Sequence, residues 1–222
     1  MPHNTEANIG KYEAACWRLT GMGKTMAIAT TMRPLVSLAL PEKGATRFAT
    51  QLLLAIAGTL LLTLSAKTKV VLGPVDISLQ TLAVLLIASA FGLRLGVATL
   101  LLYMAEGAMG FPVFQGTPEK GIGLAYMVGS TGGYLAGFVV MAAIVGWAAD
   151  RGWDRHPVKL FNAMLVAEIV MMAMGFAWLA LLIGAEKSWQ FGVVPFIVGD
   201  LIKVALAASL VPAVWSLLSK RP

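Results

Sequence analysis

Only one cysteine, Cys16, and two histidines, His3 and His156, occur in the 222 residues. A single thiol cannot form an intrachain disulfide, and it cannot supply a zinc site built from several cysteines. Both histidines lie outside the apolar runs, and no G-x-S-x-G sequence occurs. We therefore expect no metal, no covalently bound cofactor and no enzymatic activity.

Charged residues are also scarce, at 13% of the chain, whereas a soluble globular protein carries roughly 25%. Hydrophobic residues make up 58%, and they form long continuous runs instead of the alternating pattern of a membrane β-barrel. The string "GMGKT" at 21–25 is not a phosphate-binding loop, because Arg18 stands where that motif requires glycine. The composition predicts an all-α, multi-pass membrane protein without its own ATP site.

The apolar runs predict six transmembrane helices, and the second and third are short for a bilayer span of roughly 20 residues. We expect the tight turn "FGLRLG", 91–96, to join these two. The predicted helices cover about 47–66, 79–92, 95–110, 129–149, 159–184 and 192–218.

The basic residues predict the orientation of these helices. With a cytoplasmic N-terminus, the inside segments hold twelve Lys and Arg residues, the outside loops hold four, and Lys203 lies within a span. Because cytoplasmic loops are enriched in Lys and Arg, both termini should face the cytoplasm. We therefore attribute the net charge of +6 to the basic residues that orient the helices in the membrane, and we expect no nucleic acid partner.

One membrane domain accounts for most of the chain, and we expect it in the cytoplasmic (inner) membrane. Residues 1–46 carry Pro34, Pro41 and scattered charges, so they read as a cytoplasmic extension, amphipathic or partly disordered, and not as a cleavable signal peptide. The domain covers 47–218, and 219–222 form a short cytoplasmic tail.

Two charged residues, Asp200 and Lys203, interrupt the outer half of the last apolar run. They are three residues apart and therefore share one helix face. Ionisable groups inside a membrane are costly and are functional candidates by default. The two residues either form a structural ion pair or line a polar ligand pocket open to the outside, and these roles are compatible.

The string "GSTGGYLAG", 129–137, opens the fourth predicted helix on the same side. Gly132 and Gly133, beside Thr131, allow close approach of a ligand or of another helix, and Gly133 with Gly137 has the GxxxG spacing of packed membrane helices. Both roles remain open.

Several other side chains have two interpretations. The aromatic residues Phe114 and Tyr134 either wall the pocket or belong to the interfacial aromatic belt. Glu106 either lines the pocket or reaches the outer interface, and Glu168 lies deeper without an assigned partner.

These motifs resemble the BioY family, the biotin-specific S-components of energy-coupling-factor (ECF) vitamin transporters. The similarity lies in "SLQT", "GFPVF", "TGGYLAG" and "GDLIK", whose order and spacing cover about 67–218. The resemblance implies a six-helix bundle with cytoplasmic termini and a biotin pocket near the outer surface.

The resemblance also implies site residues. Asp200 and Lys203 match the biotin contacts of the last helix, Gln115 matches a polar contact in the loop after helix three, and Gln80 matches the glutamine that opens helix two. The family docks on a transmembrane coupling subunit through small residues of helix one, for which Ala45, Ala49 and Ala55 are the candidates here.

Partners follow from the same resemblance. A coupling subunit and two ATPase subunits would supply energy, so that ATP is used only by partners. Two alternatives remain: a solitary biotin transporter, acting alone or as a homo-oligomer, and an S-component for another small vitamin. Ser130 departs from the family, which often has proline in the glycine-rich string.

Overall fold

The computed structural model describes residues 34–219 except 39, 42–43, 72–75 and 118–120. Most of the predicted N-terminal extension therefore lies outside the described residues, and so do 220–222 of the tail. The division of the chain at residue 46 stays a prediction.

Five helices are long and apolar enough to cross a membrane, which makes the chain a multi-pass membrane protein. They are α2 (Ala45–Lys67), α3 (Gln80–Ala108), α5 (Gly132–Asp150), α6 (Pro157–Ile183) and α8 (Val194–Ser219). The fifth span includes two short elements that lead into α8: α7 (Ala185–Ser188) and the π-helical η3 (Trp189–Val193). Short connecting elements are η1 (Leu35–Leu38), α4 (Leu124–Met127) and η2 (Trp153–Arg155).

Helix α3 is folded back on itself at Gly92, within the predicted turn. Gly92 has φ 75° and ψ −176°, a backbone region open essentially only to glycine. The Gln80 amide lies 3.1 Å from the Tyr103 hydroxyl, although 23 residues of straight helix would separate them by about 35 Å. The two limbs of α3 correspond to the second and third predicted helices, while the count of six membrane crossings stays a prediction.

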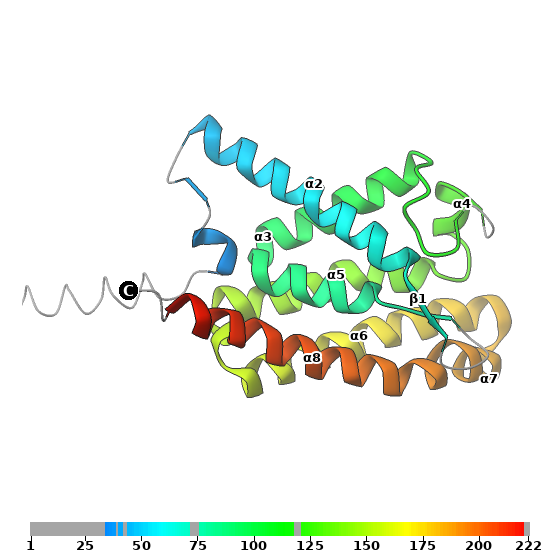
Figure 1. Cartoon of the computed structure of the whole chain (residues 1–222). Coiled ribbons are helices and arrows are strands. Elements are labelled where there is room, and N and C mark those ends of the chain that lie inside the picture. Colours follow the sequence, from blue (N-terminus) through cyan, green and yellow to red (C-terminus); the bar gives the residue numbers. More distant parts are fainter. Residues whose placement is uncertain (1–33, 39, 42–43, 72–75, 118–120, 220–222) are drawn as a thin grey trace, which may run out of the picture. The chain divides into compact units, whose positions relative to one another are not determined.

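The connection from α2 to α3 is a short hairpin that the sequence analysis did not predict. Strand β1 (Lys69–Val71) pairs antiparallel with β2 (Asp76–Ser78), with Lys69 opposite Ser78. Figure 1 shows the hairpin, α4 and α7 at one end of the bundle, and the C-terminal end of α8 at the other. The connections that can cover a ligand therefore gather at that end.

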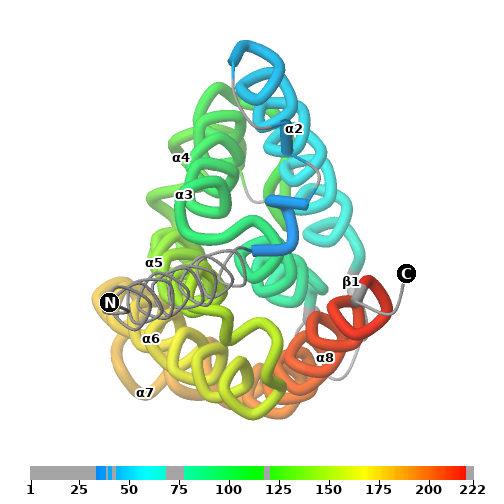
Figure 2. Tube along the Cα trace, turned by 90° about the vertical axis from the view of Figure 1, so that its left-hand side faces the viewer, coloured from blue at the N-terminus to red at the C-terminus, as the bar shows by residue number. Residues whose placement is uncertain are grey.

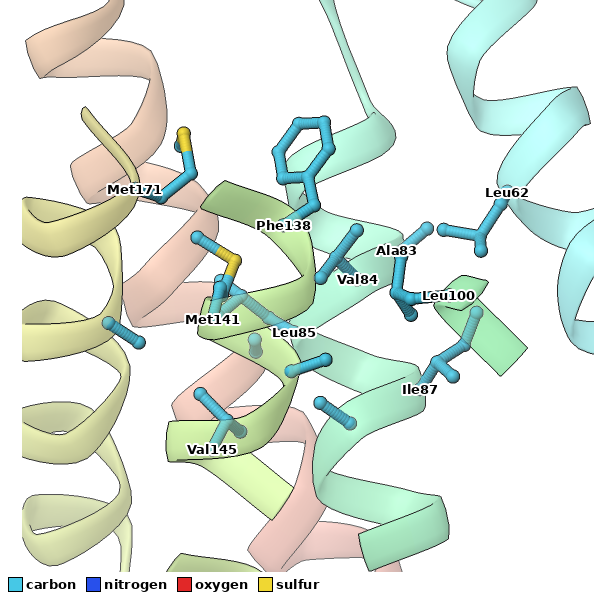
Figure 3. Close-up of a cluster of buried hydrophobic side chains, with 14 of the residues drawn as sticks. Leu62, Ala83, Val84, Leu85, Ile87, Leu100, Phe138, Met141, Val145 and Met171 are labelled. Carbon is cyan, nitrogen blue, oxygen red and sulfur yellow. The ribbon is translucent and has the colours of Figure 1, made fainter. Parts of the chain in front are cut away.

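The helices pack around α3 and α5, which lie side by side along much of their length. Helix α2 packs on α3, α6 packs on α5, and α8 packs on both α6 and α3, as the tube view in Figure 2 shows. Side chains from all five long helices fill the core, including Leu62, Leu85, Leu100, Met141 and Met171 (Figure 3) and Val204 of α8. This packing fixes the relative positions of α3, α5, α6 and α8.

Candidate functional site

A cavity of about 430 Å³ opens between α3, α5, α6 and α8, and Ser78 of the hairpin is among the residues that line it. This volume is within the range of small-molecule sites, about 300–1,000 Å³. Its polar lining residues are Ser78, Gln80, Thr81, Gln115, Tyr126, Ser130, Thr131, Tyr134, Asp200 and Lys203. Its apolar lining residues are Leu135, Phe138, Met171, Met172, Leu179, Ile183, Phe191, Gly192 and Phe196. The arrangement suits a ligand that has both a polar head and an apolar body.

Asp200 and Lys203 form an ion pair in this cavity. The Lys203 Nζ donates to Asp200 Oδ1 over 2.8 Å, and the residues are 7% and 3% exposed, respectively. Helix geometry brings them together, because residues three apart are neighbours on a helix surface. A desolvated pair with free lone pairs and N–H groups can exchange some of its mutual contacts for contacts with a ligand.

Gln80 reaches the cavity from the start of α3. Its side-chain amide donates to the Tyr103 hydroxyl, which in turn donates to the Val113 carbonyl over 2.9 Å. This chain of hydrogen bonds joins the two limbs of α3 to the loop that follows them. It also fixes the orientation of the Gln80 amide, whose carbonyl oxygen is left as an acceptor.

The loop from Gly110 to Thr117, which includes the lining residue Gln115, is held in place from α2. The Lys67 Nζ donates to the carbonyl oxygens of Phe114, at 2.9 Å, and Thr117, at 2.7 Å, and also to the Thr117 hydroxyl. The sequence indicated Lys67 only as one of the four basic residues in the predicted outside loops. Because its partners are backbone atoms 47 and 50 residues away, no local pattern could have indicated this role.

Phe114 packs behind the cavity and does not line it. Its ring stacks on Tyr126 with centroids 5.0 Å apart and meets Tyr103 edge-on at 5.3 Å. Tyr126 does line the cavity, and burial raises the pKa of its phenol, which therefore remains a neutral donor. The sequence analysis missed Tyr126, which lies in a short helix with no motif around it.

Tyr134 and Thr131 line the cavity from the start of α5. The Tyr134 hydroxyl donates to the Gly192 carbonyl over 2.8 Å, which links α5 to the π-helical lead-in of α8. The sequence analysis also missed the apolar walls Phe196 and Met172, because nothing distinguishes them from lipid-facing residues in an apolar run.

The glycines of the GxxxG spacing face α6. A Cβ added to Gly133 would come within 2.6 Å of the Met174 carbonyl oxygen, and one added to Gly137 within 3.0 Å of the Met171 Cα. A Cβ added to Gly132 would likewise clash with the Met127 carbonyl oxygen and come within 3.2 Å of Trp178 Nε1. The structure thus brings Gly132 and Gly133 to packing contacts and not to the cavity lining, and their role as ligand contacts stays a prediction.

The docking candidates on α2 fall on different faces. Ala45 and Ala49 are exposed, but Ala55 is buried against the rest of the bundle. Glu106, also considered for the pocket, is half-buried and accepts a hydrogen bond from the Thr59 hydroxyl over 2.9 Å. Within the described part of the chain, no group of three His, Cys, Asp or Glu residues is placed to hold a metal.

Comparison with known proteins identifies relatives over most of the chain. The profile of the BioY family matches residues 30–220. A biotin transporter BioY of Thermotoga maritima is 36% identical over 160 residues, which cover 71% of this chain and 91% of the relative. A probable biotin transporter BioY of Pyrococcus horikoshii is 36% identical over 147 residues, covering 66% and 85%.

The fold is also similar to a solved structure. The crystal structure at 2.1 Å of the S-component for biotin from an ECF-type ABC transporter superposes with a TM-score of 0.64. The match covers 78% of this chain and 95% of the other, at 20% sequence identity. At that identity the likeness shows a shared fold.

Proposed function

The chain belongs to the BioY family, and from this premise we propose that it is the biotin-binding S-component of an ECF-type vitamin transporter. The observation that carries the proposal is the buried Asp200–Lys203 pair in the wall of a cavity of about 430 Å³. Relatives named as biotin transporters supply the identity of the ligand.

The chemistry of biotin fits the cavity. Its ureido ring has two N–H donors and one carbonyl acceptor, its thioether ring and alkyl chain are apolar, and its chain ends in a carboxylate. In the proposed complex, Asp200 accepts a hydrogen bond from one ureido N–H, and Lys203 donates to the ureido carbonyl. The buried ligand then regains the hydrogen bonds it loses from water.

The remaining contacts follow from the lining residues. The carbonyl oxygen of Gln80 and the side chain of Gln115 are placed to meet polar ligand atoms, and Phe196 and Tyr134 supply aromatic walls for the thioether ring and chain. We propose that the hairpin and the Gly110–Thr117 loop close over the ligand.

Uptake requires energy from elsewhere. We propose that the protein lies in the cytoplasmic membrane with its pocket near the outer face, and that a coupling subunit with two ATPase subunits drives inward delivery. Ala45 and Ala49, exposed at the start of α2, are the proposed docking positions. The alternative of a solitary transporter shares the same binding site.

Equilibrium binding of labelled biotin to the purified full-length chain tests the proposal. We expect tight binding by the wild type and a loss of about 10- to 100-fold in Asp200→Asn and Lys203→Met, because each variant removes a charged hydrogen-bond partner of the ligand, worth about 1.5–3 kcal/mol. Lys159→Met is the control. Lys159 is exposed in the first turn of α6, whereas the residues of α6 that line the cavity lie in its second half.

Each outcome has a defined meaning. Unchanged affinity in both folded site variants would make the ion pair structural. A folded wild type that ignores biotin but binds thiamine or riboflavin in competition assays would overturn the ligand assignment.

A further inference from the structure

Glu168 lies behind the cavity in the middle of α6. It is 6% exposed and lines a second, largely apolar cavity of about 410 Å³ between α6 and α8. The two cavities share the lining residues Met172 and Asp200. Asp200 therefore stands between the proposed ligand and Glu168.

The Glu168 carboxyl group has an unusual environment. Neither of its oxygens accepts a hydrogen bond from any donor among the described residues. It nevertheless lines this second cavity together with Asp200, the acid with which it interacts electrostatically. Two carboxyl groups can form a hydrogen bond only when one of them carries a proton. Two ionised carboxylates side by side would repel each other in a dry environment, because Lys203 supplies only one positive charge for the two.

The charges near Glu168 support the same conclusion. Asp200 and Lys203, both from α8, are the charged groups that interact with it. On α5, the titratable group nearest to this cluster is Tyr134, whose hydroxyl donates a hydrogen bond to the Gly192 carbonyl oxygen. The charged residues of α7 and η2 are beyond the two ends of α6, about 16 Å or more along the helix axis.

We propose that Glu168 is a positioning residue that carries a proton and donates it as a hydrogen bond to Asp200, so that the cluster of Glu168, Asp200 and Lys203 is neutral. With one Asp200 oxygen bonded to Glu168 and Oδ1 bonded to Lys203, the carboxylate is fixed in orientation toward the cavity. Loss of the proton places a second negative charge beside Asp200 and competes for Lys203. In what it says of biotin, this inference rests on the proposed function.

Two measurements on the full-length chain test the inference. The first needs no ligand: infrared difference spectra between about pH 6 and about pH 9 detect the carbonyl band of a protonated carboxyl group. Because other buried acids such as Asp154 can add to this band, the difference between variants is the readout. We expect the same intensity in the wild type and in Glu106→Gln, and a lower intensity in Glu168→Gln. Glu106 is the matched control because it is a helical acid with its own donor, Thr59, and it lines neither cavity.

The second measurement is the affinity for biotin across the same pH range, in which the biotin carboxylate stays ionised. We expect wild-type affinity to fall about tenfold as pH rises. Glu168→Gln should vary less than about twofold, because its neutral amide still donates to Asp200, and its affinity should be near the wild-type value at about pH 6. Glu168→Ala should bind weakly throughout, because Asp200 loses that donor.

A flat wild-type profile, a carboxyl band of undiminished intensity in Glu168→Gln, or weak binding by folded Glu168→Gln at about pH 6 would each overturn the inference. If the wild type binds no biotin, the proposed function fails, and the infrared band alone decides whether Glu168 is protonated.

Discussion

Asp154 is a buried acid at the end of the bundle opposite the cavity, in the turn before α6. Its Oδ2 accepts a hydrogen bond from the Trp215 Nε1 over 2.6 Å, and its Oδ1 has no partner among the described residues. The Arg155 guanidinium lies 4.3 Å above the Trp215 ring. These contacts join the turn to the end of α8 and hold α6 and α8 together away from the ligand site.

Burial raises the pKa of Asp154, and this makes stability depend on pH. Because the folded-state pKa lies above the unfolded value, the stabilising contribution is complete below the unfolded pKa, about 3.9, and is lost as pH rises through the folded pKa. Asp154→Asn keeps an acceptor for Trp215 but carries no charge. We expect the melting temperature of this variant, relative to the wild type, to increase from about pH 4.5 to about pH 8.

Trp215→Phe tests the contribution of the Trp215–Asp154 hydrogen bond to stability at neutral pH. It removes a hydrogen bond to a charged acceptor, worth about 1.5–3 kcal/mol. The melting temperature of the purified protein should then fall by about 3–10 °C, and the fall should be smaller in the Asp154→Asn background. Equal effects in both backgrounds would mean that the negative charge of Asp154 does not strengthen this hydrogen bond.

Site residues differ in how far the sequence could predict them. Asp200 and Lys203 could be predicted from the sequence, because charges inside an apolar run are rare and their spacing places them on one helix face. The structure brings them together as predicted, although their function stays a proposal. Lys67, Tyr103 and Tyr126 were missed, because their roles depend on contacts between distant segments that no local pattern encodes.

Among the helices, α3 depends most on a single backbone position. At Gly92, any residue with a Cβ would be strained, and that Cβ would also meet the Asp150 side chain and come within 2.9 Å of the Pro34 ring. The turn also gains a hydrogen bond from the Leu93 N–H to Asp150 Oδ2 over 3.2 Å. The reversal is therefore held by both conformation and contact.

We expect Gly92→Ala to destabilise the protein by more than about 3 kcal/mol, or to prevent folding, because backbone strain of about 1–3 kcal/mol adds to the clash. Gly184→Ala is the matched comparison: Gly184 has φ 89° but no atom within 4 Å of the added Cβ. Gly184→Ala therefore measures the cost of backbone strain alone. The difference between the melting temperatures of the two variants gives the cost of the clash at Gly92. Similar melting temperatures would show that the contacts of Gly92 do not matter.

The long helices were predictable because continuous apolar runs of sufficient length leave the backbone few alternatives in lipid. Their ends shifted by a few residues, as in α5, which begins at Gly132 and not at 129. The β1–β2 hairpin, α4 and α7 were not predicted. Each of these strands and helices has three or four residues, too few to show a periodic pattern.

The number of membrane crossings depends on whether α3 reverses at Gly92 within the bilayer. Reversal at Gly92 favours two crossings by α3, which gives six in total and returns the C-terminus to the side of the N-terminus. A straight α3, without the reversal, would cross once, which would give five crossings and place the termini on opposite sides. The positive-inside pattern of the sequence favours six crossings with both termini in the cytoplasm.

Labelling with a membrane-impermeant maleimide in intact cells distinguishes the topologies, because the chain has a single cysteine. With six crossings, Cys16 reacts only after permeabilisation. In a Cys16→Ser background, Glu186→Cys, at an exposed position in α7, then reacts in intact cells, whereas Leu218→Cys, near the end of α8, does not. With five crossings and the same N-terminal side, the last two results are exchanged. Reaction of Cys16 in intact cells would instead show that the N-terminal segment is outside, and would reverse the orientation on which the outward-facing pocket depends.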